Sequence, residues 1–337
     1  MKNIALYFVL VVFFACSESL EVKRQQLFLK GNIALEEGKF DQSLYYYNQS
    51  LELSDTFPSV YNNAAIAYEK LGKNEEAFES YEKALSVDPE FWRAYFNRAR
   101  LWQQIGNYRN ALSNLEMIEK PYADSSSFYF IKGLSHTGLS NYDLAEKAFL
   151  KAQNLNQENV EIPINLATLH YYQKQYDQAM SYINDIGNVD DHPQALNLLG
   201  LIYTEKEDYD KATQSFTKAI QTSSDPYYYN NRGYAYLLSG SLEKGMDDIK
   251  YSLLENDENP WAFRNKGIYH YLKDEWDQSE QSLRKSYMMD STVNLTTYYL
   301  GMVKYKSGDK SEACELLYKS SVNNEKQGQQ AYGSLCR

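Results

Sequence analysis

The segment "PSVYNNAAIAYEKLGKNEEAFESYEKALSVDPEF" (58–91) holds two helical patterns divided by a short turn. On both sides of "LGKNEE" (71–76), apolar residues recur at i, i+3, i+4 and i+7, which places them on one face of an α-helix. The glycine in the turn favours the end of the first helix. The segment therefore predicts a pair of antiparallel helices.

The same pattern recurs along most of the chain. With 58–91 as the template, copies begin at residues 24, 58, 92, 126, 160, 193, 226, 260 and 294, spaced by 34 residues six times and by 33 twice. In all nine copies the eighth and twentieth positions are small (Gly, Ala or Ser) and the twenty-fourth is large and apolar. Small residues allow two helices to approach closely, and large ones fill the space around that contact. One unit cannot bury its apolar face alone, so the copies are expected to stack as a solenoid.

The residues that carry this pattern resemble the tetratricopeptide repeat, and the fullest copy has Tyr61, Ala65, Tyr68, Ala77, Tyr81, Ala84 and Pro89. The resemblance covers residues 24–323. It implies an all-α, right-handed superhelical solenoid of about nine antiparallel helix pairs. Residues 324–337 follow the last copy and are expected to form a C-terminal capping helix, which solenoids need to cover their end.

Two copies depart from the pattern. The third ends in Ile118 and runs into "EKPYADSSS" (119–127), and the fifth has Pro163 at its fourth position and Ile186 near its end. Proline is tolerated in a helix only in the first turn. We expect shorter second helices and looser packing at these two junctions, which are candidate bends.

Residues 1–15 have the composition of a signal peptide. One lysine precedes an apolar run from Ile4 to Ala15, which is too short to span a bilayer as a helix but suits a secretory signal. The run ends at Ala15-Cys16, which resembles the bacterial lipoprotein signal, and this implies lipidation of Cys16 and a membrane-anchored lipoprotein of the cell envelope, at the outer membrane or the periplasmic face. The alternative is cleavage after Ser17, which would give a soluble periplasmic or secreted protein.

Cys314 and Cys336 are the only other cysteines. A single remaining pair in an exported protein predicts a disulfide, which would fix the capping helix to the last repeat. The alternative is two small buried thiols.

The sequence offers little that would carry chemistry. The net charge is −11 and no cluster of Lys or Arg occurs, so nucleic acid is not an expected partner. The sequence has no Cys-x-x-Cys pair, phosphate-binding glycine loop or nucleophile motif. We therefore expect no enzyme activity, no cofactor and no metal site.

The resemblance implies that the first helix of each repeat lines a concave groove. The sixth position is asparagine in five repeats, at Asn63, Asn97, Asn165, Asn231 and Asn265. Because an amide both donates and accepts, this row could pair with the backbone of an extended peptide, or it could only bridge neighbouring helices. The other candidate groove residues are Arg93, Arg100, Tyr227, Tyr234, Trp261 and Arg264.

These features predict a non-enzymatic interaction scaffold or assembly subunit at the bacterial cell envelope that binds an extended polypeptide segment. The alternative is a lipoprotein that binds a glycan or another small ligand, since sugars stack on aromatic rings. The regular repeat spacing leaves no insertion in which a sugar site would be built. The sequence does not identify the partner.

Overall fold

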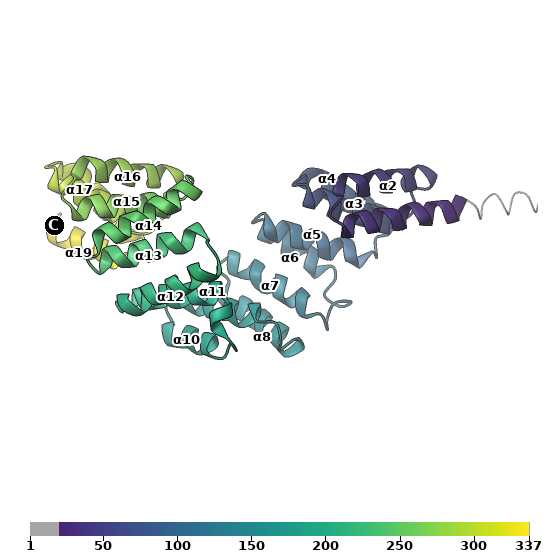
Figure 1. Ribbon diagram of the computed structural model, residues 1–337, viewed down its shortest axis with the longest axis horizontal. Coiled ribbons are helices and arrows are strands. Elements are labelled where there is room, and N and C mark those ends of the chain that lie inside the picture. The colour runs from purple at the N-terminus through teal and green to yellow at the C-terminus, as the bar shows by residue number, and fades with distance from the viewer. Residues whose placement is uncertain (1–19, 337) are drawn as a thin grey trace, which may run out of the picture. The chain divides into compact units, whose positions relative to one another are not determined.

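The computed structural model describes residues 20–336, and this part of the chain is helical throughout, without strands (Figure 1). The predicted signal peptide 1–15 and the predicted lipidation site Cys16 lie outside the described residues. The chain divides into two compact units between Asn165 and Leu166, inside helix α9 (Glu161–Tyr172).

The first unit is a series of helix pairs. It begins with a helix over residues 20–36 and continues with α2 (Phe40–Leu53), α3 (Pro58–Lys70), α4 (Asn74–Val87), α5 (Trp92–Gln104), α6 (Tyr108–Glu116), α7 (Ser126–Gly138) and α8 (Tyr142–Leu155). The members of each pair, such as α3 with α4 and α7 with α8, contact each other along their length.

The second unit continues the same arrangement. Its elements are α10 (Tyr176–Asn184), the short 3₁₀ helix η1 (Val189–Asp191), α11 (Pro193–Glu205), α12 (Tyr209–Thr222), α13 (Pro226–Leu238), α14 (Leu242–Glu255), α15 (Pro260–Leu272), α16 (Trp276–Met289), α17 (Thr296–Lys306), α18 (Lys310–Val322) and α19 (Lys326–Leu335). The all-α fold of stacked helix pairs expected from the repeats is thus confirmed.

The small residues of the repeat sit where the paired helices touch. A Cβ atom added to Gly200 in α11 would lie 2.5 Å from the ring of Phe216 in α12, which is fully buried. In the next repeat both small positions are glycine, and a Cβ atom on Gly233 would lie 2.9 Å from the carbonyl oxygen of Gly245. The close approach inferred from the eighth and twentieth positions is therefore a direct contact, and the twenty-fourth residue packs on the eighth.

The turn inside each repeat uses one left-handed residue at the fifteenth position. Five turns have glycine there (Gly38, Gly72, Gly106, Gly240, Gly308) and four have another residue (Ser140, Lys174, Glu207, Asp274), all with φ between 58° and 92°. Glycine adopts this conformation without steric cost, whereas other residues do not. In four of the turns, a non-glycine residue therefore adopts the left-handed conformation that the repeat geometry requires, although this conformation is unfavourable for it.

The two irregular repeats have short second helices, as expected. Helices α6 and α10 each have 9 residues, whereas α4, α8 and α12 each have 14. The side chains that replace small residues there, Ile118 and Ile186, are 0% and 7% exposed, so the looser packing that we expected is not seen at these positions.

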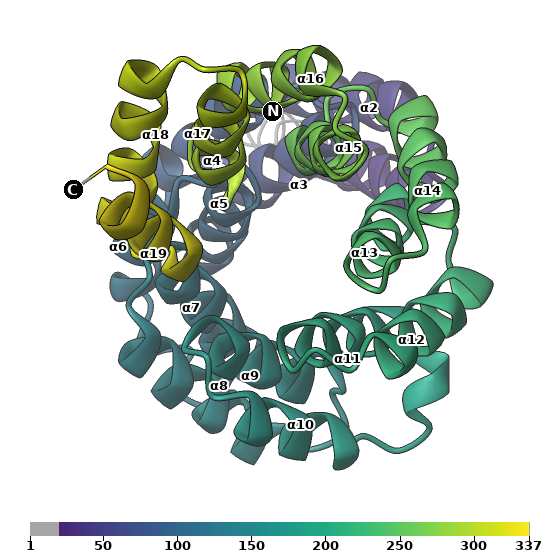
Figure 2. The same ribbon diagram turned by 90° about the vertical axis from the view of Figure 1, so that its left-hand side faces the viewer.

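The first helices of successive repeats form the inner face of each unit. In the first unit α3 contacts α5 and α5 contacts α7, although a second helix stands between them in the chain. In the second unit α11, α13, α15 and α17 make the same succession of contacts, and α12, α14, α16 and α18 lie outside them (Figure 2). Residues on the first helices are therefore the ones placed to meet a ligand on the inner face.

The C-terminal helix α19 packs against α18. Gly328 and Ala331 are buried in this contact, and a disulfide joins Cys314 of α18 to Cys336, with 5.6 Å between the Cα atoms. Helix α19 therefore covers the end of the last repeat. Within residues 20–336, no helix combines the length and apolar composition needed to cross a bilayer.

Candidate functional site

The asparagines of the sixth position link neighbouring repeats. In three places the Nδ2 of this residue donates to the Oδ1 of the fifth residue of the preceding repeat: Asn97 to Asn62 (3.0 Å), Asn231 to Asn197 (2.9 Å) and Asn265 to Asn230 (2.8 Å). These amides bridge adjacent first helices, which is the alternative that the sequence left open.

The remaining two asparagines of the row have other acceptors. Asn63 donates to the Oδ1 of Asn32 in the first repeat (2.9 Å), and Asn165 donates to the carbonyl oxygen of Glu161 one turn earlier in α9 (2.8 Å). All five amides therefore use at least one N–H within the protein. Asn63, Asn97, Asn165 and Asn231 stay half-buried and keep some access to solvent.

Arg264 and Asn265 are not available to a partner, and their assignment to the groove was wrong. Arg264 is 6% exposed and Asn265 is 0% exposed. The Nε and Nη2 atoms of Arg264 donate to the Oδ1 of Asn265 (2.9 and 2.8 Å), and Nη1 donates to the Oδ1 of Asn294 (2.6 Å). Arg264 is buried because its side chain is long enough to reach the turn before α17, where Asn294 accepts a hydrogen bond from it.

An aromatic ring covers the buried guanidinium. The Cζ of Arg264 lies 4.8 Å from the ring centroid of Tyr234, which is half-buried, so the two residues form a cation–π pair. Burial lowers the pKa of Arg264 and raises that of Tyr234. Both residues therefore hold α13, α15 and the turn before α17 together.

Tyr227 and Trp261 are the exposed aromatic residues of the predicted groove. They occupy the second position of consecutive repeats, and they are 42% and 40% exposed. Each lies at the start of a first helix, where a capping side chain fixes its backbone: Asp225 accepts from the N–H of Tyr227 (2.8 Å) and Asn259 accepts from that of Trp261 (3.1 Å). The cap thereby fixes the backbone that carries each ring.

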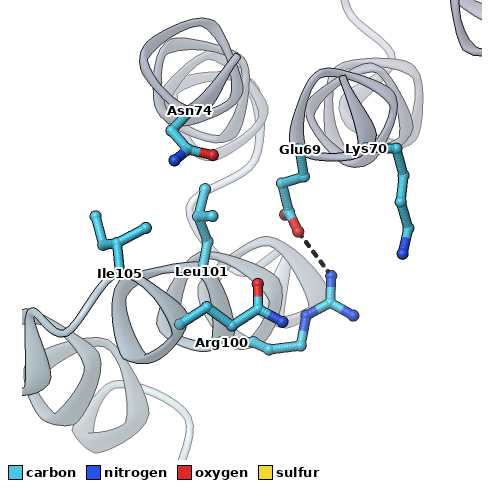
Figure 3. A pocket seen from close by; sticks show the side chains of 7 residues that line it. Glu69, Lys70, Asn74, Arg100, Leu101 and Ile105 are labelled. Atoms are coloured by element: carbon cyan, nitrogen blue, oxygen red, sulfur yellow. Dashed lines mark hydrogen bonds and ion pairs between the residues drawn. The ribbon is translucent and has the colours of Figure 1, made fainter. Parts of the chain in front are cut away.

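The first unit has a cavity of about 260 Å³ between α3, α4 and α5 (Figure 3). It is lined by Glu69 and Lys70 from the end of α3, Asn74 from the start of α4, Arg100, Leu101 and Gln104 from α5, and Ile105 directly after α5. Of these, only Arg100 is among the residues expected from the sequence. Glu69 and Lys70 hold the twelfth and thirteenth positions of their repeat, at the end of its first helix. Because the first helices were expected to line the groove, the repeat numbering could have identified both residues as candidates.

An ion pair forms the wall of this cavity. The Nη2 of Arg100 lies 3.0 Å from the Oε2 of Glu69, and the hydroxyl of Tyr81 donates to the Oε1 of the same carboxylate. Burial raises the pKa of Glu69, and the bonds from Tyr81 and Arg100 oppose this shift only in part. Burial and the neighbouring Glu69 raise the pKa of Tyr81 as well.

The guanidinium of Arg100 has at least one N–H donor without an acceptor. Its Nη2 donates to Glu69, and its Nε is buried without an acceptor. Arg93, seven residues earlier on the same helix, is exposed and makes no ion pair in this part of the chain. Both predicted arginines of the first unit therefore retain binding capacity, whereas Arg264 does not.

Two histidines are joined by their side chains to the turns that follow their helices. The Nδ1 atoms of His170 and His270 lie 2.6 Å from the side-chain oxygens of Gln175 and Glu275, five residues further on. No group of three or more His, Cys, Asp or Glu side chains suited to a metal ion occurs within residues 20–336.

Stacked helix pairs with touching first helices define a helical-repeat protein. The chain belongs to the tetratricopeptide repeat family. One model of that repeat matches residues 58–91, another matches residues 126–159 and 193–226, and a TPR repeat model matches residues 31–72.

Curated relatives match only in part. The bovine (Bos taurus) BBSome complex member BBS4 is 28% identical over 122 residues, which cover 36% of this chain and 24% of that protein. Hsp70-Hsp90 organizing protein 2 of Arabidopsis thaliana is 21% identical over 256 residues, which cover 76% of this chain and 40% of that protein. The chain thus spans less than half the length of these relatives.

Solved structures share the fold. The Cut9-Hcn1 hetero-tetramer of the APC/C has a TM-score of 0.63 at 12% identity, over 93% of this chain and 76% of that one. The pilF protein of Pseudomonas aeruginosa has a TM-score of 0.53 at 20% identity, over 63% and 96% of the two chains. At this level of identity the likeness concerns architecture alone.

Proposed function

We propose that the protein is a non-enzymatic scaffold that binds an extended polypeptide segment of a partner along the first helices of its repeats. The observation that carries this proposal is the pair Tyr227 and Trp261, two exposed rings at the same position of adjacent repeats. Exposed aromatic residues on a rigid helical surface are the usual anchors of protein interfaces. The equivalent position of the third repeat is the exposed Arg93.

Membership of the family supports the same class of function, because repeat solenoids present extended surfaces to other macromolecules. The name of the bovine relative places that protein in a multi-subunit complex. By analogy, we propose that the present chain also takes part in the assembly of a protein complex.

Site-specific cross-linking in intact envelopes tests the proposal. A photo-cross-linking amino acid at position 227 or 261 is expected to capture a protein partner. The matched control is position 288, where Met288 on the outer helix α16 is 84% exposed. Equal capture at all three positions would contradict binding at the first helices, and a glycan in place of a protein adduct would favour the ligand-binding alternative.

The same residues set the strength of binding. We expect Tyr227→Ala with Trp261→Ala to weaken binding of the captured partner by about tenfold or more, as for central aromatic anchors, whereas Met288→Ala should leave it unchanged. Isothermal titration with the identified partner measures both effects. An unchanged affinity in the double variant would exclude these rings as anchors.

For location, we propose a lipoprotein of the cell envelope that is anchored through Cys16. The support is the apolar run that ends at Ala15-Cys16. Mass spectrometry of the mature N-terminus should find a diacylglyceryl group on Cys16, and Cys16→Ser should release the protein from the membrane. A mature chain that begins at Glu18 without lipid would indicate ordinary cleavage.

A further inference from the structure

We propose that the N-terminal helix (20–36) binds the surface of a lipid bilayer through an exposed apolar stripe formed by Val22, Leu29 and Ile33. This inference rests on the proposed location, because it states how a chain anchored through Cys16 would meet the membrane. It is carried by the exposure of the stripe, by the positions of its residues in the repeat and by the charges beside it.

The N-terminal helix has apolar residues on two faces. Phe28 and Ala34 lie on the face that packs against α2 and α3, since Phe28 joins their apolar cluster and Ala34 is buried (Figure 1). Val22, Leu29 and Ile33 are seven and four residues apart, so they form one stripe on the far side of the helix. All three are about half exposed. Packing within the first unit does not account for this second apolar face, which therefore indicates an interaction site.

The repeat positions of the stripe are buried elsewhere in the chain. Ile33 holds the tenth position and is 55% exposed, whereas the residue at this position in each of the other eight repeats is at most 6% exposed. Leu101, for example, lies in one apolar cluster with Tyr81 of the preceding repeat. Leu29 holds the sixth position, through which Asn97 bonds to its preceding repeat. The stripe is thus a surface that a preceding repeat covers in other copies, and within residues 20–336 no helix covers it.

The proposed anchor would bring a bilayer to this surface. On that proposal, four residues, 16–19, separate the lipid from the N-terminal helix. Four residues span at most about 14 Å, which is less than the length of the helix itself, about 25 Å. The start of the helix would therefore remain close to the bilayer. A segment of four residues is also too short to take the place of a covering helix.

The charge of the helix suits a lipid surface. Residues 20–36 carry three cations and two carboxylates, in a chain whose net charge is −11. Lys23 and Lys30 lie beside the stripe, are exposed and form no ion pair within residues 20–336. Glu21 forms an ion pair within the same helix, and Glu36 lies in the last turn, farthest from the proposed anchor. Lysines that flank a membrane-bound apolar face can extend their ammonium groups to lipid phosphates.

A bilayer fits this stripe better than a protein does. Stable protein interfaces bury about 800 Å² on each partner, which three half-exposed side chains do not supply. A second copy of the chain would also bring its own Lys23 and Lys30 to the contact, so like charges would meet. A short apolar stripe is sufficient as an addition to a lipid anchor, because membrane binding strengthens with each further apolar group that is buried.

Photo-cross-linking in intact envelopes identifies what covers the stripe. A photo-reactive amino acid at position 33 is expected to form phospholipid adducts, which mass spectrometry of the tryptic peptide detects. The matched control is position 117, where Met117 directly after α6 is 58% exposed, and it should form none. Adducts with a second copy or another protein at position 33 would overturn the proposal. So would equal lipid adducts at both positions, or no adduct at position 33.

Vesicles of phosphatidylethanolamine and phosphatidylglycerol measure the contribution of the stripe. The mature chain from Ser17, which carries no lipid, is expected to sediment with them. Leu29→Gln with Ile33→Gln should weaken this binding by about tenfold, because two aliphatic side chains no longer enter the interface, whereas Met117→Gln should not change it. Thermal unfolding checks that the variants fold, as expected for exposed positions. Equal binding of all three proteins, or no binding of the unsubstituted chain, overturns the proposal.

The vesicle experiment is independent of the proposed anchor, because the chain used has no Cys16. A diacylglyceryl group on Cys16, combined with equal vesicle binding of the variants, would leave the anchor standing and overturn the stripe. Stripe-dependent vesicle binding by a protein whose natural N-terminus carries no lipid would have the opposite meaning. The scaffold function is decided separately, by the cross-linking at positions 227 and 261.

Discussion

The side chain of Asn265 donates a hydrogen bond to Asn230 across 2.8 Å, and the two residues are 0% and 1% exposed. The same link joins Asn231 to Asn197 and Asn97 to Asn62. In a repeat protein, stability is approximately a sum over repeats and the interfaces between them. These amides therefore belong to the interfaces, and they stabilise the surface on which a partner would bind.

Replacement of Asn265 by alanine should be strongly destabilising. Asn265 accepts two hydrogen bonds from the buried Arg264, so its loss leaves the Nε and Nη2 of a buried cation without their acceptor and is expected to cost about 3 kcal/mol. Asn97→Ala, at a half-buried site, should cost about 1 kcal/mol. Urea unfolding and hydrogen exchange measure both, with the exposed Gln214→Ala of α12 as control. Equal effects of all three would contradict this account.

The contact between Gly200 and Phe216 makes a second prediction. Gly200→Ala places a methyl group against the ring and should destabilise the chain by about 1–3 kcal/mol, as overpacking does. The third repeat has the buried pair Ala99 and Leu115 at the same two positions. The double variant Gly200→Ala with Phe216→Leu should therefore recover part of the loss, and thermal unfolding of the four proteins in the cycle checks this. Additive effects would show that the two positions do not touch.

The repeat columns were predictable because they depend on contacts inside one repeat. Gly200 and Phe216 are sixteen residues apart, and each copy repeats their relationship. The role of Arg264 was not predictable in this way, because its acceptor Asn294 belongs to the next repeat, 30 residues further on. The cavity beside Arg100 likewise depends on Glu69 of the preceding repeat. Side chains that reach across a repeat boundary are governed by the stacking geometry, which one copy does not specify.

The turns at the fifteenth position offer a stabilising change. Glu207 has φ 61° between α11 and α12, a conformation that costs non-glycine residues about 1 kcal/mol. Glu207→Gly should relieve this and raise the free energy of unfolding by roughly 0.5–1 kcal/mol. Gly240 is the matched control, since it has φ 82° and open space around it, so Gly240→Ala should lower stability through backbone conformation alone. Calorimetry of both variants measures these changes in stability. A loss of stability in Glu207→Gly would show that Glu207 is not strained in this turn.

The disulfide should act locally. It closes a segment of 22 residues between Cys314 and Cys336, for which the chain-entropy treatment gives about 3 kcal/mol. Reduction, or Cys314→Ser with Cys336→Ser, is expected to speed hydrogen exchange in α19 and the end of α18, while α3 to α5 keep their protection. Mass spectrometry of the oxidised protein should find no free thiol at these positions. Unchanged exchange in α19 after reduction would mean that packing alone holds the helix.

The buried Glu69 should make the stability of the first unit depend on pH. Burial raises the pKa of Glu69 in the folded chain, so the folded state holds this proton more tightly than the unfolded state does. The contribution is fully present below the ordinary carboxyl pKa, and it is lost as pH rises from that value through the raised one. The free energy of unfolding of the wild type should therefore fall, relative to Glu69→Gln, as pH rises above about 4.5.

The variant Tyr81→Phe tests the direction of this pH dependence. The Tyr81 hydroxyl donates to Glu69 and lowers its pKa, so its removal should raise that pKa further and extend the loss of stability to higher pH. Urea unfolding between about pH 4 and pH 7, followed by hydrogen exchange in α3, compares wild type, Glu69→Gln and Tyr81→Phe. Because the pH dependence is assigned to one carboxyl group, it should also be absent from the double variant Glu69→Gln with Tyr81→Phe. Parallel stability profiles in all four proteins would mean that Glu69 titrates alike in the folded and unfolded chain.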